Sequence, residues 1–419
     1  MSVFSSKRTV ATTVVAAVAS VALTAGVSIP AQAADNQLVV GAITPLTGAL
    51  SFLVPPEIAG IHLAIDEINA AGGVLGKQVK LAGILDEADG DSPAVSQASA
   101  TKLLSQKVDL IIGAASSART RLIINKITGA KVVQISGSNT APDLTNWKDN
   151  GYYFRTAPSD LLQGRVLANQ ILQDGASSVA VLYQDTSYGV GLNAQVKSVL
   201  EKGKASVTSI SFPETETNFA SYVDKALAGK PDAVVIVSYN ESKKIIPALQ
   251  AKGYSGGNVY LVDGNAVDYS AESYASYLNG AKASIPGKAL DDSFKKKLAA
   301  SYKKYTGKVL TDYTYGESLY DAIIIGALAA QAAKDASGPG IKSQITEISK
   351  AGAGKVTVTS FAAGLKALQA GKKINYDGKT GAIEFDKNGD PTGAYIGIHR
   401  YSADGKFKLV KTVLGSSVK

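Results

Sequence analysis

From residue 36 onwards, short apolar runs alternate with amphipathic stretches, and this alternation restricts the chain to an α/β fold. The first apolar runs stand at 37–46, 77–89, 108–114 and 131–137. Helical patterns lie between them: in 57–73, for example, Ile58, Ile61 and Ile65 fall on one face. Strands linked in this way form right-handed βαβ units and therefore a parallel sheet. Because the runs are apolar on both faces, we expect helices to cover both sides of the sheet.

The same pattern restarts at Tyr152 and predicts a second unit of the same kind. Its apolar runs stand at 177–185, 206–213, 232–240 and 258–265, with helical patterns at 161–173, 189–203, 217–229 and 241–253. Further helical patterns follow at 288–305 and 311–335. The last part of the chain, 380–411, is predicted to form three strands separated by an Asn-Gly and an Asp-Gly turn. The predicted fold class is α/β, with two doubly wound parallel-sheet lobes.

A chain of 419 residues is too long for one ordinary core and suits two lobes with a cleft between them. Ligands of open α/β sheets bind outside the carboxyl ends of the strands, so we expect the site there. The sequence has no cysteine, which excludes disulfides, thiolate-held metal sites and a lipid anchor on an N-terminal cysteine. Its two histidines, His62 and His399, are expected to be structural or surface residues.

Residues 1–33 have the pattern of a secretory signal peptide. Two basic residues precede an apolar stretch at 10–29, and Ala-Gln-Ala follows at 31–33. We predict cleavage after Ala33 and a secreted chain. A membrane anchor is the alternative, which the weak, alanine-rich hydrophobicity of the stretch disfavours. No later segment has the run of about 20 apolar residues that a membrane-spanning helix needs.

The formal charge is +8, and the lysines are scattered or lie on helix faces, as in 291–305. A surface of this kind is attracted to acidic wall polymers or lipid headgroups. Nucleic-acid binding is not expected, because the basic residues form no concentrated patch.

At the strand ends of the first lobe, small and hydroxyl-bearing residues stand where an enzyme would place acids and bases. After the run at 108–114, a helical pattern opens at Ser116 and Ser117. Backbone amides at a helix N-terminus, together with a hydroxyl, suit a carboxylate or another anion. Ser138 and Thr140 follow the next run and can add a carbonyl acceptor and a hydroxyl donor. The alternative is that Ser116 or Ser117 only caps its own helix.

The strand ends of the second lobe bring Tyr188, Tyr239, Asp263 and Asn265. Tyrosines in these places suit a lid or a stacking platform over a small ligand, or they pack against neighbouring loops. The chain has no Gly-x-Ser-x-Gly elbow, phosphate loop or dinucleotide fingerprint, so we expect neither an enzyme nor a cofactor. The acidic stretch 386–391 lacks the rest of a calcium loop and reads as a hairpin turn.

Nine motifs occur in a distinctive order: TPLTG (44–48), AIDEINAAGG (64–73), GAASS (113–117), SNTAPDLT (138–145), YFRTAPSD (153–160), YQDTSYGVG (183–191), NFASYVDKA (218–226), PDAVVIVSYNES (231–242) and INYDGKTGAIEFDKNGDP (374–391). Together they resemble the extracytoplasmic solute-binding proteins of branched-chain amino acid ABC transporters, over about residues 38–401. This resemblance implies the type I periplasmic-binding fold with a three-crossing hinge near 156–158, 268–270 and 392–394. Lobe 1 is then 37–157 plus 270–393, and lobe 2 is 158–269 plus 394–419.

The resemblance also implies a function and a set of ligand contacts. A branched-chain amino acid is expected between the lobes, with its carboxylate at Ser117 and further carboxylate and ammonium contacts at Ser138 and Thr140. Tyr188 closes over the solute, and Tyr239 matches a second tyrosine. The protein is then a monomeric receptor, periplasmic or envelope-associated and not a lipoprotein, which delivers its solute to the membrane subunits of an ABC permease.

Two positions depart from the family pattern and leave the solute open. The acidic residue that binds the ammonium matches Asn265, with Asp263 two residues earlier. An amide lacks the charge that favours an ammonium partner, so either Asp263 binds it or the solute is a small carboxylate or amide without one. A first-lobe tyrosine of the family falls near Phe52, which predicts a more apolar pocket. A sensor that feeds a membrane receptor remains the alternative function.

Overall fold

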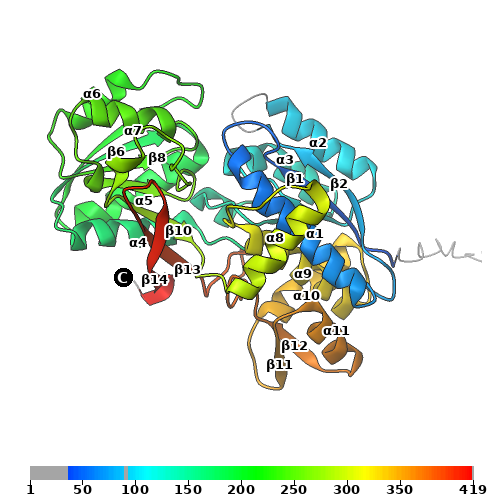
Figure 1. Ribbon diagram of the computed structural model, residues 1–419. Coiled ribbons are helices and arrows are strands. Elements are labelled where there is room, and N and C mark those ends of the chain that lie inside the picture. The colour runs from blue at the N-terminus through cyan, green and yellow to red at the C-terminus, as the bar shows by residue number, and fades with distance from the viewer. Residues whose placement is uncertain (1–35, 89–92, 418–419) are drawn as a thin grey trace, which may run out of the picture. The chain divides into compact units, whose positions relative to one another are not determined.

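The strands of the described residues, 36–88 and 93–417 of this computed structural model, form two large sheets and one small one (Figure 1). The predicted signal peptide and its cleavage point after Ala33 lie outside the described residues. Each large sheet forms the centre of one lobe.

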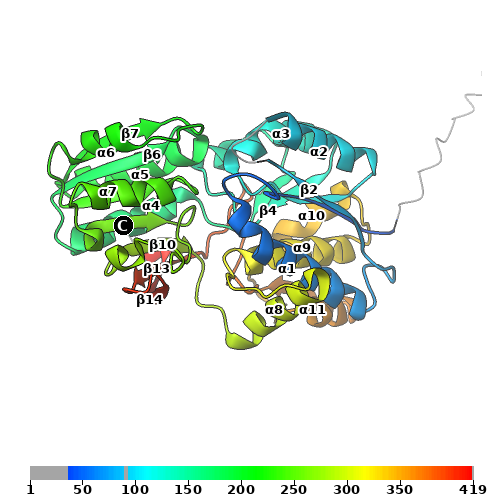
Figure 2. The ribbon, with the colours of Figure 1, turned by 45° about the horizontal axis from the view of Figure 1, so that its top comes forward.

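The first large sheet is parallel throughout, as predicted. Its order is β2-β1-β3-β4-β5, with β1 (Val39–Thr44), β2 (Lys80–Asp86), β3 (Leu110–Gly113), β4 (Val133–Ser136) and β5 (Tyr153–Arg155). Every residue of β3 and β4 is buried, which explains why these runs are apolar on both faces. On one face lie α2 (Pro93–Ser105) and α3 (Ser117–Gly129), and on the other α1 (Val54–Ala70), α9 (Gly316–Ala333) and α10 (Gly338–Ser349) (Figure 2).

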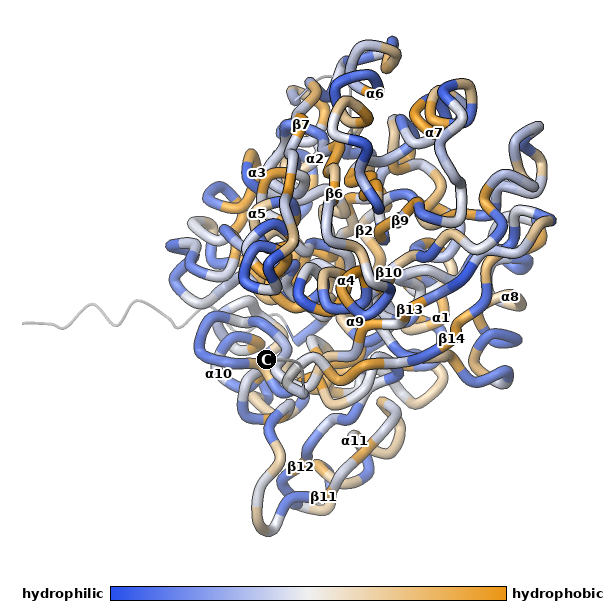
Figure 3. The backbone as a smooth tube through the Cα atoms, turned by 90° about the vertical axis from the view of Figure 1, so that its left-hand side faces the viewer, coloured by the Kyte–Doolittle hydropathy of each residue, from blue (hydrophilic) through white to orange (hydrophobic). Residues whose placement is uncertain are grey.

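The second large sheet mixes parallel and antiparallel pairs. Its order is β14-β13-β10-β9-β8-β6-β7, with β6 (Ser178–Gln184), β7 (Ser206–Phe212), β8 (Ala233–Val237), β9 (Val259–Val262), β10 (Lys282–Pro286), β13 (Tyr395–Tyr401) and β14 (Phe407–Leu414). The helices of this lobe are α4 (Asp160–Gln173), α5 (Ser187–Lys202), α6 (Ala220–Leu227) and α7 (Ser242–Ala251). Buried strands such as β6 and β9 run as hydrophobic segments through this lobe (Figure 3).

The structure corrects the predicted second crossing between the lobes. Residues 270–286, expected in lobe 1, lie in the second lobe, because β10 pairs parallel with β9 and antiparallel with β13. The chain therefore crosses between Pro286 and the start of α8 (Asp292–Thr306). The sequence hid this strand, since Lys-Ala-Ser-Ile-Pro has no run of β-branched residues.

The end of the chain follows the prediction only in part. The Asp-Gly hairpin is confirmed, because β13 and β14 pair antiparallel and Tyr401 lies opposite Phe407. The strand expected at 380–386 is wrong: this stretch is irregular apart from isolated bridges, one of which joins Phe385 to Pro391. Its turn is held by Asp386, whose Oδ1 accepts the amides of Asn388 and Asp390 at 2.8 and 3.0 Å.

Additional segments enlarge the first lobe. They are α8, α9, α10, α11 (Phe361–Gln369) and a small parallel sheet of β11 (Lys355–Val358) and β12 (Lys373–Tyr376). The apolar residues of α9 are buried against the sheet and neighbouring helices. None of the helices in the described part of the chain combines the length and apolarity needed to cross a bilayer.

A buried ion pair joins two of the segments that lead into the crossings. Arg155, at the end of β5, is fully buried and contacts Asp390 through Nε–Oδ1 at 2.6 Å and Nη2–Oδ2 at 2.7 Å. The guanidinium also donates to the carbonyl of Ala141 at 2.9 Å and to the hydroxyl of Thr145 at 2.7 Å. The bidentate geometry fixes where the chain leaves and re-enters the first lobe.

Candidate functional site

A small cavity, lined mainly by buried residues, lies where residues of both lobes meet. It is lined by Leu50, Leu53, Ala115, Ser117, Ser138, Thr140, Tyr188, Tyr239, Asp263, Gly264 and Tyr315. Six of the eight candidate site residues are therefore brought together. The cavity measures about 20 Å³, enough for about one water molecule. A solute the size of an amino acid needs its walls to move apart.

On the first-lobe wall, the two adjacent serines have different roles. Ser116 is the N-cap of α3, and its hydroxyl accepts the amide of Arg119 at 3.4 Å. The Ser117 hydroxyl instead accepts the amides of Thr140 and Ala141, each at 3.3 Å. The capping alternative thus applies to Ser116, while Ser117 faces the cavity.

The backbone amides expected to be free at this helix start already have a partner. The amides of Ala115 and Ser116 donate to the carboxylate of Glu87 at 2.6 and 2.9 Å. Glu87 is fully buried and follows β2. The sequence pattern gave no reason to connect it with the start of α3, which follows a different strand. A solute carboxylate on this wall therefore has the Ser117 and Thr140 hydroxyls as its nearest predicted donors.

Gly113 shapes this wall by bringing β3 very close to β1. Its φ is +104°, and a Cβ added there would lie 2.0 Å from the carbonyl oxygen of Ile43. Only glycine fits such a position, because a side chain would clash with backbone and the positive φ would be strained. The glycine that ends the strand at 110–113 thus reflects a steric requirement.

A buried carboxyl group lies behind Ser138. The Ser138 hydroxyl donates to Oε1 of Glu57 at 3.1 Å, and the other carboxyl oxygen of Glu57 has no hydrogen-bond partner among the described residues. Burial raises the pKa of Glu57 to about 8, and the Ser138 bond opposes this only in part. Glu57 is therefore mainly uncharged at neutral pH and leaves the wall neutral.

The second-lobe wall is organised around Asp263. Its Oδ1 accepts from Gln163 Nε2 at 2.7 Å and from the Tyr188 hydroxyl at 2.9 Å, and its Oδ2 accepts from the Tyr315 hydroxyl at 2.7 Å. Burial raises the pKa of Asp263, and these donors lower it. Tyr239 stacks on Tyr188 with ring centroids 5.3 Å apart, so the aromatic cover is a pair.

Asp160, which sequence reading did not assign, is a second carboxyl group in this region. It is fully buried at the start of α4, where a hydrogen bond from the Thr140 side chain and the charge of Arg155 lower its pKa only in part. Burial raises the pKa of Asp160 well above its usual value, and the nearby charge of Asp263 raises it further. Two buried carboxyl groups that interact are stabilised by a shared proton or a cation between them. This part of the site therefore favours a cationic group.

Tyr315 is the other residue that sequence reading missed. It precedes α9 in the left-handed region, with φ 63° and ψ 0°. A bulky residue is rarely held in this conformation, and such strain is often found at functional sites. No local signal identifies it, because its partner Asp263 is 52 residues away in the sequence.

Two candidates do not reach the cavity. The Asn265 side chain accepts the amide of Val262 at 2.9 Å and donates to the carbonyl of Ile236 at 2.8 Å, so it fastens its own loop to β8. Phe52 packs against the first-lobe core, and its neighbour Leu53 lines the cavity instead. The carboxyl group that lines the cavity and is available to an ammonium is thus Asp263.

The family comparison agrees with this architecture. The model of the family described as periplasmic binding protein matches residues 37–363. The chain belongs to this family. Its fold is the type I periplasmic-binding fold, and its structural relatives include branched-chain amino acid binders.

Among characterised relatives, the substrate-binding protein BasB of a chemotactic signal transduction system, from Halobacterium salinarum, is 27% identical over 87% of each chain. The leucine-specific-binding protein of Salmonella typhimurium is 24% identical over 96% of this chain and 99% of its own. Among solved structures, leucine binding protein LivK of Thermotoga maritima has a TM-score of 0.74 at 21% identity, covering 91% of this chain and 99% of its own. LivJ of Streptococcus pneumoniae, solved with isoleucine, has a TM-score of 0.70 at 23% identity, with 90% and 99% covered.

Proposed function

We propose that this periplasmic binding protein takes up an α-amino acid between its lobes and delivers it to an ABC permease. The main support is that groups suited to a carboxylate and a group suited to an ammonium line the same cavity. Ser117 and Thr140 offer hydroxyls to a carboxylate on one wall, and Asp263 offers a carboxylate to an ammonium on the other. Solutes that lack the ammonium or the carboxylate leave the groups of one wall without a partner, and buried polar groups without partners are costly.

The proposed mechanism is closure of the lobes around the solute. Since the cavity has walls from both lobes, a solute makes its full set of contacts only in the closed arrangement and shifts the population toward it. The stacked Tyr188 and Tyr239 then exclude water, and the closed form docks on the permease. Catalysis forms no part of this proposal, because relatives in this family are solute-binding proteins.

Calorimetric titration of refolded, ligand-stripped protein tests the proposal. The panel comprises leucine, isoleucine, valine, other amino acids, and their decarboxylated and deaminated counterparts. We expect micromolar or tighter binding that requires both the amino and the carboxyl group. Ser117→Ala should weaken it at least tenfold, and Ser105→Ala, an exposed serine at the end of α2, should not. A folded protein that binds none of the amino acids would contradict the proposal.

A sensory role is a second candidate, because one relative belongs to a chemotactic signal transduction system. The closed form would then contact a membrane transducer. Cross-linking of the solute-loaded protein in its own cells distinguishes the two: permease subunits support transport, and a transducer supports sensing.

We also propose that the chain is exported, with its N-terminal 33 residues removed. The support is the signal pattern together with the extracytoplasmic location of its family. N-terminal sequencing of the protein from the producing cells should begin at Ala34. An intact N-terminus at Met1 would contradict this.

A further inference from the structure

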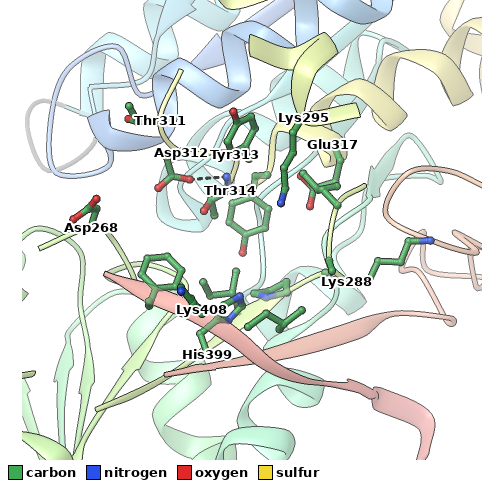
Figure 4. A pocket seen from close by; sticks show the side chains of 18 of the residues that line it. Asp268, Lys288, Lys295, Thr311, Asp312, Tyr313, Thr314, Glu317, His399 and Lys408 are labelled. Carbon is green, nitrogen blue, oxygen red and sulfur yellow. Dashed lines mark hydrogen bonds between the residues drawn. The ribbon is translucent and has the colours of Figure 1, made fainter. Parts of the chain in front are cut away.

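A second, much larger cavity shares Tyr315 with the first. Figure 4 shows residues that line it. Its volume is about 490 Å³, within the usual range for small-molecule sites. It is lined by the connection from β10 to α8, by the loop that leads into α9, and by residues of β13 and β14. Both lobes therefore contribute to it.

Tyr315 is the wall that the two cavities share. The smaller cavity contains the groups that recognise a carboxylate and an ammonium, but its volume leaves no room for a side chain. Its apolar walls, Leu50 and Leu53, are buried in the first-lobe core. The large cavity is the space next to the head-group site, and Tyr315 lies between the two.

The polar groups of the large cavity suit an anion. Lys295 and Glu317 extend into it from the first lobe, and His399 and Lys408 face them from the second (Figure 4). Glu317 is 5% exposed and has a carboxyl oxygen without a partner among the described residues. Burial raises the pKa of Glu317 to about 8, so at neutral pH it is mainly a hydrogen-bond donor.

The remaining lining supports the same assignment. Burial lowers the pKa of His399 to about 4, which keeps this ring neutral, and its Nδ1 also lacks a partner within the described chain. Of the acids, Asp312 already accepts the amide of Thr314 at 2.7 Å. Lysines outnumber charged acids around the cavity. Apolar residues, among them Phe407, also line the cavity and can cover a methylene chain.

We infer that the large cavity holds the distal part of the solute, and that the solute is an α-amino acid with an extended side chain ending in a carboxylate. The inference rests on the proposed function, because the head group stays between Ser117 and Asp263. Lys295 binds the distal carboxylate, Glu317 donates to it, and Tyr315 turns aside to let the chain pass.

The test compares matched ligands and matched lysines. Titration with 2-aminoheptanedioate and 2-aminoheptanoate, which differ only in the distal carboxylate, should give at least tenfold tighter binding of the diacid. Lys295→Ala should abolish this ratio. Lys296→Ala removes the same charge from the next residue of α8, which is exposed and outside the cavity, and should keep the ratio.

The outcomes separate this inference from the proposed function. Equal binding of the two ligands, or an unchanged ratio in Lys295→Ala, overturns the inference, and tight leucine binding would then leave the proposed function standing. Failure of all α-amino acids to bind overturns both. At least tenfold weaker binding of both ligands in Ser117→Ala, with the Lys295 effect confined to the diacid, supports both.

Discussion

Replacing Asp263 by asparagine separates affinity from stability, because the two should change in opposite directions. The amide has nearly the same shape: its oxygen can still accept from Gln163 and Tyr188, and its NH₂ group can donate to the Tyr315 hydroxyl. The change therefore removes a charge and little else. A hydrogen bond to a charged group contributes about 1.5–3 kcal/mol, so we expect the dissociation constant for the solute to rise by roughly 10- to 150-fold.

The solute-free protein, by contrast, should become more stable at neutral pH. Asp263→Asn removes a buried negative charge that raises the pKa of Asp160, and it lowers the cost of ionising that neighbour. Calorimetric titration measures the affinity, and thermal unfolding of stripped protein measures the stability. Asp224→Asn is the control: it breaks only an exposed ion pair between α6 and Lys252, so affinity should not change and stability should fall by less than about 1 kcal/mol. An affinity within threefold of wild type, or a fall in stability, would refute this account of the site.

Further changes test the titration, the crossings and the cleft. Folding raises the pKa of Asp160 above its value in the unfolded chain, about 4, so ionisation of this group lowers the stability of the folded state as the pH rises above about 4. Asp160→Asn should therefore raise the unfolding temperature at pH 7 and change it little at pH 3. Asp390→Asn leaves Arg155 buried without its charge partner and should cost about 3–5 kcal/mol in chemical denaturation; a cost below 1 kcal/mol would contradict the buried pair. Glu214→Gln breaks the ion pair with Arg119, which joins α3 to the second lobe at 3.1 Å. Because Glu214 is partly exposed, we expect the calorimetric affinity to fall by less than about 1 kcal/mol, and the difference should shrink in high salt; a larger, salt-independent loss would show that the pair does more than bridge the lobes.

Local rules were sufficient for the parts of the site that lie at strand ends. The alternation of apolar runs and amphipathic helices predicts parallel sheets, and the carboxyl ends of parallel strands meet at one edge. Ser117 and Thr140 follow neighbouring strands of the first sheet, so this rule places them together, and Asp263 follows a strand of the second sheet, so the rule places it at a strand end of the other lobe. The same rule predicted the position of Tyr188, which lies in the first turn of the helix after β6 and lines the cavity.

Tertiary structure decided which of two neighbouring side chains faces the solute. Asp263 and Asn265 lie two residues apart in one turn, yet Asp263 lines the cavity and Asn265 points back to the backbone of β8. The backbone amides of Ala115 and Ser116 were expected to be free, but a carboxylate from the end of β2 occupies them. Composition and periodicity do not contain this information, because it depends on which groups compete for the same donor.

Sequence patterns could not predict the contacts made by residues from distant segments, for the same reason. Asp263 takes its hydrogen bonds from residues 52, 75 and 100 positions away: Tyr315, Tyr188 and Gln163. Tyr315 belongs to a segment whose only visible pattern is that of a helix. The sequence by itself determined the two lobes and the strand ends that form the site, because hydrophobic periodicity is local. The tertiary structure decided the buried carboxyl pair and the wall at Tyr315, because these depend on how the chain returns to the first lobe after β10.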